Sequence, residues 1–128
     1  MTPVRKALGF VPAALYYAGI FGLSAKSSFP FQELFSGFDK IVHIGEFAGL
    51  GFLLAWALFR LPSGPGPVRA RRPAAWAGAL GTALGLMDEF HQVFVPGRHP
   101  DLLDAAADVV GIGLGIGLLV VLRRRSGF

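Results

Sequence analysis

The segment Leu102–Arg125, LLDAAADVVGIGLGIGLLVVLRRR, decides the fold class of this chain. Up to Leu122 it carries only two charged side chains, Asp104 and Asp108, and three consecutive arginines follow. An α-helix needs about 20 mostly apolar residues to cross the hydrocarbon core of a bilayer. The segment therefore predicts a membrane-spanning helix over residues 102–122, with its arginines at a membrane surface.

Three further apolar runs precede this segment and predict helices over residues 5–24, 40–60 and 74–94. Hydrophobic residues make up 53% of the 128 residues and charged residues 16%, with a mean hydropathy of +0.56. This composition is too apolar for an ordinary soluble domain. We therefore predict an all-α polytopic membrane protein, a four-transmembrane-helix bundle formed by residues 1–128 as one domain. Residues 61–73, rich in Pro, Gly and Arg, predict a flexible hydrophilic loop.

The first apolar run allows two interpretations. Arg5 and Lys6 ahead of it are also typical of a signal peptide, with a weak candidate cleavage site after Ala25. The run is long for a signal peptide, and its removal would leave an odd number of spans, so we favour a retained helix. Pro12, near its start, is expected to kink this helix.

The basic residues are distributed unequally between the two predicted membrane sides. Nine fall on the side of the termini and three on the other side. The nine are Arg5, Lys6, Arg60, Arg69, Arg71, Arg72, Arg123, Arg124 and Arg125, and the three are Lys26, Lys40 and Arg98. The positive-inside rule then predicts both termini in the cytoplasm. Topology and anionic lipid thus account for the net charge of +4 without a nucleic-acid partner.

The acidic and histidine residues gather on the opposite side, in or near the outer half of the predicted helices. They are Glu33, Asp39, Glu46, Asp88, Glu89, Asp101, Asp104 and Asp108, with His43, His91 and His99. Orientation rules do not require this, because acidic residues contribute little to topology. The chain has no cysteine, which excludes a thiolate zinc site and a cysteine nucleophile.

The spacing of these residues places several of them on common helix faces. Asp39, His43 and Glu46 are four and three residues apart and share one face. Asp101, Asp104 and Asp108 do the same, and their stripe continues as Gly111 and Gly115. Gly111, Gly113, Gly115 and Gly117 are expected to pack against another helix. Lys40 is expected to anchor its helix at the membrane surface.

A tight turn predicted over residues 95–98 (VPGR) makes the last two helices an antiparallel hairpin. It brings Asp88, Glu89, His91, Gln92 and Arg98 to the same end as the other acids. Each acid near a helix centre costs about 2.5–3.5 kcal/mol, so such groups are functional candidates by default. The alternative is that they only join helices by hydrogen bonds. Their convergence favours a polar pocket that opens outward between the helices at 40–60, 74–94 and 102–122.

Residues 39–43 (DKIVH), 88–98 (DEFHQVFVPGR) and 104–111 (DAAADVVG) resemble the VanZ-like membrane proteins, over about residues 39–122 of this chain. The resemblance implies these family-motif positions: Asp39, His43, Glu89, Gln92, Arg98, Asp104 and Asp108. Many members of that family carry Asn at the position of Asp108. The founding member is associated with low-level resistance to the glycopeptide antibiotic teicoplanin, so the resemblance implies a multi-pass protein of the cell envelope, in the bacterial cytoplasmic membrane.

Two classes of function fit these residues. In the first, the pocket binds or transports a lipid-linked or envelope substrate, such as an isoprenoid phosphate or a lipid-linked cell-wall precursor. Its ligand-binding residues are Asp39, Asp88, Gln92 and Arg98. Arginine holds phosphate with a planar two-point fork.

In the second, the chain is a membrane-embedded enzyme, a hydrolase or transferase acting on such a substrate. Its candidate catalytic residues are His43, Glu46, Glu89, His91, Asp104 and Asp108. A divalent metal is a candidate cofactor, because carboxylates and imidazoles bind such ions. No serine, threonine or cysteine is expected in the cluster as a nucleophile. A purely structural envelope partner is the third alternative, and Gly45 and Gly49 are a candidate face for a homo-oligomer.

Overall fold

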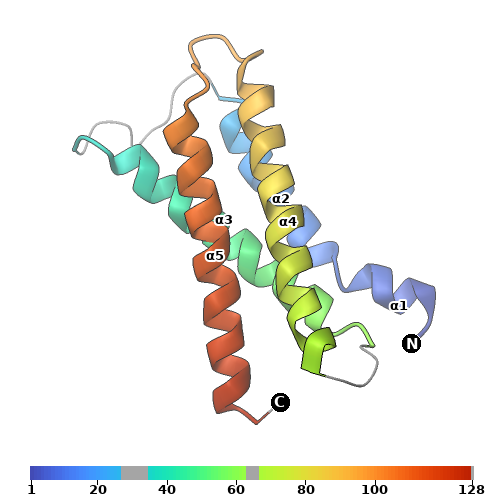
Figure 1. Cartoon of the computed structure of the whole chain (residues 1–128). Coiled ribbons are helices and arrows are strands. Elements are labelled where there is room, and N and C mark those ends of the chain that lie inside the picture. Colours follow the sequence, from blue (N-terminus) through green and yellow to red (C-terminus); the bar gives the residue numbers. More distant parts are fainter. Residues whose placement is uncertain (27–34, 63–66, 128) are drawn as a thin grey trace.

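In the computed structural model, described for residues 1–26, 35–62 and 67–127, the chain forms helices only (Figure 1). The helices are α1 (Pro3–Leu8), α2 (Val11–Ser24), α3 (Phe38–Phe59), α4 (Pro67–Gln92) and α5 (Leu102–Arg125). No strand occurs within those described ranges, so the all-α prediction is confirmed. Glu33, one of the acids placed near the outer side, lies outside the described residues.

The first predicted helix, over residues 5–24, is divided into α1 and α2. Pro12 is the cause, because it has no N–H and its ring does not fit in the middle of a helix. It instead occupies the first turn of α2, which starts at Val11, where a missing N–H costs nothing. In Figure 1, α1 turns away from the direction of α2.

Three segments are long and apolar enough to cross a membrane: Pro3–Ser24, Phe38–Phe59 and Leu102–Arg125. They give the chain the character of a membrane protein. The fourth predicted span falls on α4, which does not meet the same criterion, because small residues and two acids lower its hydropathy. Large apolar side chains such as Phe90, Phe94 and Leu118 lie exposed on the outside of the bundle.

The start of α4 differs from the expected flexible loop over residues 61–73. The helix begins at Pro67, and Pro73 lies inside it. Proline is favoured in the first turn of a helix, and the arginines and alanine that follow have high helix propensity. The loop prediction is therefore wrong from Pro67 onward.

The predicted hairpin of the last two helices is present. After α4, the Arg98 N–H donates to Val95 O at 3.2 Å, which closes a four-residue turn. Pro96 takes its second position, and Gly97 its third with φ 79°, a value that favours glycine. Figure 1 shows α4 and α5 running antiparallel, joined by this connection.

Close approach of α3 and α5 is the packing feature that positions the site. A Cβ atom on Gly111 would collide with the carbonyl oxygen of Ile44, and one on Gly115 with that of Ala48. The two glycines are four residues apart and share one helix face. Gly113 and Gly117 face open space, so the expectation that all four glycines pack is wrong for these two. The glycine seam formed by Gly111 and Gly115 fixes the level of α5 relative to α3.

An apolar core lies next to the seam. Its fully buried side chains include Phe47 and Leu50 of α3 and Ile112 of α5, and α2 adds Ala13 and Ile20. The polar residues of α3 and α5 lie beyond one end of this core, at the N-terminal turns of both helices.

Candidate functional site

Lys40 joins the first turns of α3 and α5. Its Nζ atom lies within 3.0 Å of a carboxylate oxygen of Asp39, of Asp101 and of Asp104. A primary ammonium has three N–H donors, so these three contacts use its whole capacity. The sequence predicts an interfacial anchor here, whereas in the structure Lys40 connects two helices. Its spacing also indicates this role, because Lys40 lies three residues before His43 and so shares its helix face.

Asp101 is the N-cap of α5 and the member of this network that lies outside the membrane-length helices. Its carboxylate accepts a hydrogen bond from the Leu103 N–H at 2.9 Å. That bond, followed by the bond from the Lys40 ammonium, holds the pKa of Asp101 below its usual value. Asp101 is therefore ionised at any ordinary pH and fastens the start of α5.

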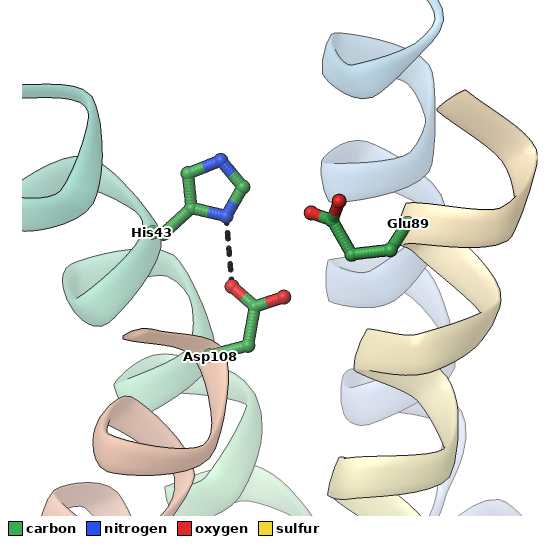
Figure 2. A group of neighbouring side chains, drawn as sticks. All are labelled: His43, Glu89 and Asp108. Carbon is green, nitrogen blue, oxygen red and sulfur yellow. Dashed lines mark hydrogen bonds and ion pairs between the residues drawn. The ribbon is translucent and has the colours of Figure 1, made fainter. Parts of the chain in front are cut away.

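One turn deeper, His43 and Asp108 face one another. The distance from His43 Nδ1 to Asp108 Oδ1 is 2.8 Å (Figure 2). On the other side of the ring, Nε2 lies 3.9 Å from Asp104 Oδ2. Side chains on α3 and α5 meet here because the glycine seam begins immediately below Asp108. The carboxylate orients the imidazole, which is the arrangement that general bases and metal-ligating histidines use.

Buried acids of α4 complete this region. Glu89 projects toward His43 and Asp108 in Figure 2, and its Oε2 accepts the backbone N–H of Asp101 at 3.3 Å. Asp88 is fully buried and accepts a hydrogen bond from Ser24 Oγ at 2.7 Å. One oxygen of each of Asp88, Glu89 and Asp108 is buried with no hydrogen-bond partner among the described residues. Such groups are costly unless a ligand, an ion or a proton compensates them.

A cavity of about 240 Å³ lies beside these groups. It is lined by Leu23, Ser24, Asp39, Lys40, Val42, His43, Glu46, Gln92, Gly97, Arg98, His99, Asp101 and Asp104. The lining is mainly polar and comes from α2, α3, α5, the end of α4 and the turn that follows α4. Glu89 and Asp108 do not line the cavity, but His43 contacts both the cavity and Asp108.

The contribution of α2 was not predicted. Ser24, the last residue of α2, lines the cavity and so belongs to the cluster, although nothing indicates that it is a nucleophile. Nothing in the local sequence around Ser24 indicates its place in the cluster, because only the packing of α2 against α3 and α4 brings it there. Its hydroxyl donates to Asp88 and is thus engaged in positioning a buried acid.

The ten predicted site residues divide into three groups. Asp39, His43, Glu46, Gln92, Arg98 and Asp104 line the cavity. Asp88, Glu89 and Asp108 are buried in or beside the same region. His91 is separate from the cavity lining, since its ring stacks on Phe21 of α2 with 4.0 Å between centroids. It lies two residues from Glu89 on α4, about 200° around the helix, so the two cannot face the same point.

Arg98 lies at the end of the turn after α4 and lines the cavity. Its Nε donates to the carbonyl oxygen of Lys26 at 2.9 Å, which ties the α4–α5 turn to the segment after α2. A guanidinium anchored through Nε has its plane fixed. Arg98 is therefore a positioned cation at the cavity and not a freely rotating surface charge.

These helices and this polar cluster define a membrane-type protein with a small polar cavity at one end of its helical bundle. Residues 1–123 match the VanZ/LLP1 family, and the chain belongs to that family. The match also covers α1 and α2, which carried none of the motifs. No curated protein matches the chain, and no solved structure does.

Proposed function

We propose that the cavity binds the anionic headgroup of a lipid-linked envelope substrate, and shields it or moves it, at the outer face of the bacterial cytoplasmic membrane. The observation that carries this proposal is the cavity itself, with Arg98, Gln92 and His43 converging on it from three separate segments. Planar arginine forks suit phosphate, and an isoprenoid phosphate is a ligand of this kind.

The size of the cavity favours a headgroup over a whole lipid. Sites that enclose drug-sized ligands measure roughly 300–1,000 Å³, whereas this cavity measures about 240 Å³. A phosphate with one attached polar group fits that scale. The hydrocarbon tail would then lie outside, along exposed apolar side chains such as Phe90, Phe94 and Leu102.

The charged residues of the lining indicate which other chemical groups the ligand carries. Carboxylates of Asp39, Glu46, Asp101 and Asp104 share the cavity with the cations. Carboxylates accept hydrogen bonds, so they suit hydroxyl and amino groups on the same ligand. A phosphate with its first attached polar group, such as the sugar of a lipid-linked cell-wall precursor, satisfies both sets, and the rest of that headgroup would extend out of the cavity. Binding of such a precursor is also compatible with the glycopeptide resistance associated with the founding VanZ-like protein, and needs no catalysis.

The proposed orientation places the cavity outside and both termini in the cytoplasm, with α4 as the fourth span. The nine-to-three distribution of basic residues supports this orientation. Both chain ends lie in the lower part of Figure 1, away from the connection between α4 and α5. A span less apolar than the others is tolerated where neighbouring helices cover its polar residues, as they cover Asp88 and Glu89. A homo-oligomer remains a separate proposal, in which Gly45 is open for contact but Gly49 already faces Tyr16.

A membrane-embedded enzyme is the second candidate. The observation that favours it is His43, which is oriented by Asp108 on one side and exposed to the cavity on the other. An imidazole held in this way is a suitable general base.

One experiment distinguishes the two functions. The protein is purified in mild detergent, and its bound lipids are identified by native mass spectrometry. The same sample is incubated with a lipid-linked cell-wall precursor and with an isoprenoid phosphate, and the products are analysed. Retained phospholipid-type or isoprenoid ligand without conversion supports binding. Conversion that the substitution His43→Ala abolishes supports the enzyme. Neither retention nor conversion, in protein that remains folded, contradicts both.

A further inference from the structure

The deepest part of the cluster has the composition of a metal site. His43, Glu89 and Asp108 each offer one ligand atom, and these atoms lie within 4.8 Å of one another. They come from α3, α4 and α5, one from each helix (Figure 2). We infer that these three residues bind one divalent cation of the Zn²⁺ or Mn²⁺ type, beside the proposed headgroup cavity. This inference does not depend on any lipid being bound.

The burial of two carboxylates is the independent observation that points to a ligand. Glu89 is 7% exposed and Asp108 is 1% exposed, and each has one buried oxygen without a hydrogen-bond partner among the described residues. Figure 2 shows Glu89 directed toward the other two side chains. An isolated buried carboxylate is strongly unfavourable, whereas a divalent ion offsets two of them together. The nearby Lys40 ammonium does not supply this charge, since its three donors already bind other carboxylates.

The distances fit an ion after small side-chain rotations. Zinc lies about 2.0–2.2 Å from histidine nitrogen and carboxylate oxygen, so two of its ligand atoms are roughly 3–4.4 Å apart. The Nδ1 and Oδ1 atoms of His43 and Asp108 are 2.8 Å apart, and the whole set spans no more than 4.8 Å. The three helices already hold the donors at nearly the required separation.

The donor set also selects the ion. An imidazole with two carboxylates suits Zn²⁺ and Mn²⁺, while Mg²⁺ and Ca²⁺ prefer sites made of oxygen alone. Three protein ligands leave at least one coordination position open, as in zinc sites that bind water or substrate. Since His43 borders the cavity, that position would be reached from it.

Metal binding to the purified protein tests the inference directly. The protein in detergent is stripped with a chelator, dialysed and titrated with Zn²⁺, and bound metal is counted by elemental mass spectrometry. We expect one ion per chain, with an unfolding temperature that rises with Zn²⁺ concentration. Co²⁺ in place of Zn²⁺ should give visible absorption bands that Gln in place of His43 removes. A wild-type protein that takes up no stoichiometric Zn²⁺ overturns the inference.

Matched variants assign the ligands. Glu89→Gln and Asp108→Asn should each weaken Zn²⁺ binding at least tenfold, while both keep the size and shape of the side chain. Asp101→Asn is the control, because it also removes one carboxylate of the cluster and asparagine still caps α5. If Asp101→Asn weakened Zn²⁺ binding equally, the affinity would depend only on general negative charge, and the proposed site would be overturned. An imidazole ligand favours Mn²⁺ over Ca²⁺. If millimolar Ca²⁺ displaced Zn²⁺ as strongly as Mn²⁺ does, His43 would not be a ligand. The lipid content of each sample is measured separately, so failure here leaves the proposed lipid function untouched.

Discussion

The imidazole of His43 and the carboxylate of Asp108 lie 2.8 Å apart, although 65 positions separate them in the chain. The contact joins α3 to α5 where the glycine seam ends and the polar cluster begins. Both residues are buried, since only 9% of the surface of His43 and 1% of that of Asp108 is exposed to solvent. We therefore expect loss of this buried hydrogen bond to weaken the packing of α3 against α5.

Two replacements of Asp108 should show how much its hydrogen bond, as distinct from the shape of its side chain, contributes to the free energy of unfolding. Asp108→Asn keeps an acceptor for a neutral His43, so we expect a loss of less than about 1 kcal/mol in unfolding free energy. Asp108→Leu leaves a buried imidazole without its partner and should cost about 1–3 kcal/mol. Thermal unfolding in one detergent, in metal-free buffer, measures both. Equal unfolding temperatures for the two variants would contradict the role of this hydrogen bond.

Lys40→Met should loosen the contact between the first turns of α3 and α5. The substitution leaves Asp39, Asp101 and Asp104 without their shared cation, at a site that is only partly buried. We expect a loss of about 1–2 kcal/mol, less than for a fully buried ion pair because solvent screens part of it. Lys26→Met is the control, since Lys26 is an exposed lysine near the same end of the bundle. If both variants lower the unfolding temperature equally, Lys40 acts only through net charge.

Arg98→Lys tests whether the guanidinium fork is required. Lysine keeps the positive charge, but it loses the two-point geometry and the Nε donor that binds Lys26 O. We expect most ligand retention or activity to be lost, while membrane insertion is unchanged, because charge and hydropathy hardly differ. Arg60→Lys at the opposite end should have no effect on retention. Full function of Arg98→Lys together with loss in Arg98→Ala would mean that Arg98 supplies only charge at the surface.

The four alternating glycines of α5 provide matched pairs. Gly115→Ala introduces a methyl group against the Ala48 carbonyl, and Gly111→Ala does so against Ile44. Each should cost about 1–3 kcal/mol or prevent folding, because backbone atoms cannot move aside as a side chain can. Gly113→Ala and Gly117→Ala face open space and should be neutral or slightly stabilising. Folded yield and unfolding temperature are the readouts, and a destabilised Gly117→Ala would contradict the observed seam.

Reporter fusions test the proposed orientation. A reporter active only in the cytoplasm and one active only outside are each fused after Arg125, and a second pair is inserted after Pro96, in the turn between α4 and α5. We expect cytoplasmic activity at the first position and external activity at the second, as the basic residues indicate. External activity at the C-terminal fusion would reverse the orientation. Cytoplasmic activity at both positions would mean that α5, the helix between them, does not cross the membrane.

Much of the fold follows from local properties of the sequence. Apolar length predicts the helices at 40–60 and 102–122, because spanning a bilayer demands about 20 residues of this kind whatever surrounds them. The turn at residues 95–98 was also predictable, since proline and glycine restrict the backbone locally. Helical periodicity likewise predicts that Asp39 and His43 share one helix face and that Asp104 and Asp108 share another, because residues four apart lie on the same face.

Tertiary packing decided the remaining features, because they depend on which helix faces which. Periodicity continues the stripe of Asp104 and Asp108 through Gly111 and Gly115, but only the position of α3 shows that Gly113 and Gly117 face open space. The placement of α2 brings Ser24 into the cluster and lets the ring of His91 stack on Phe21. No residue pattern in α2 itself predicts either contact. Periodicity thus determined the composition of each helix face, whereas the contacts between faces brought His43, Glu89 and Asp108 together from three helices.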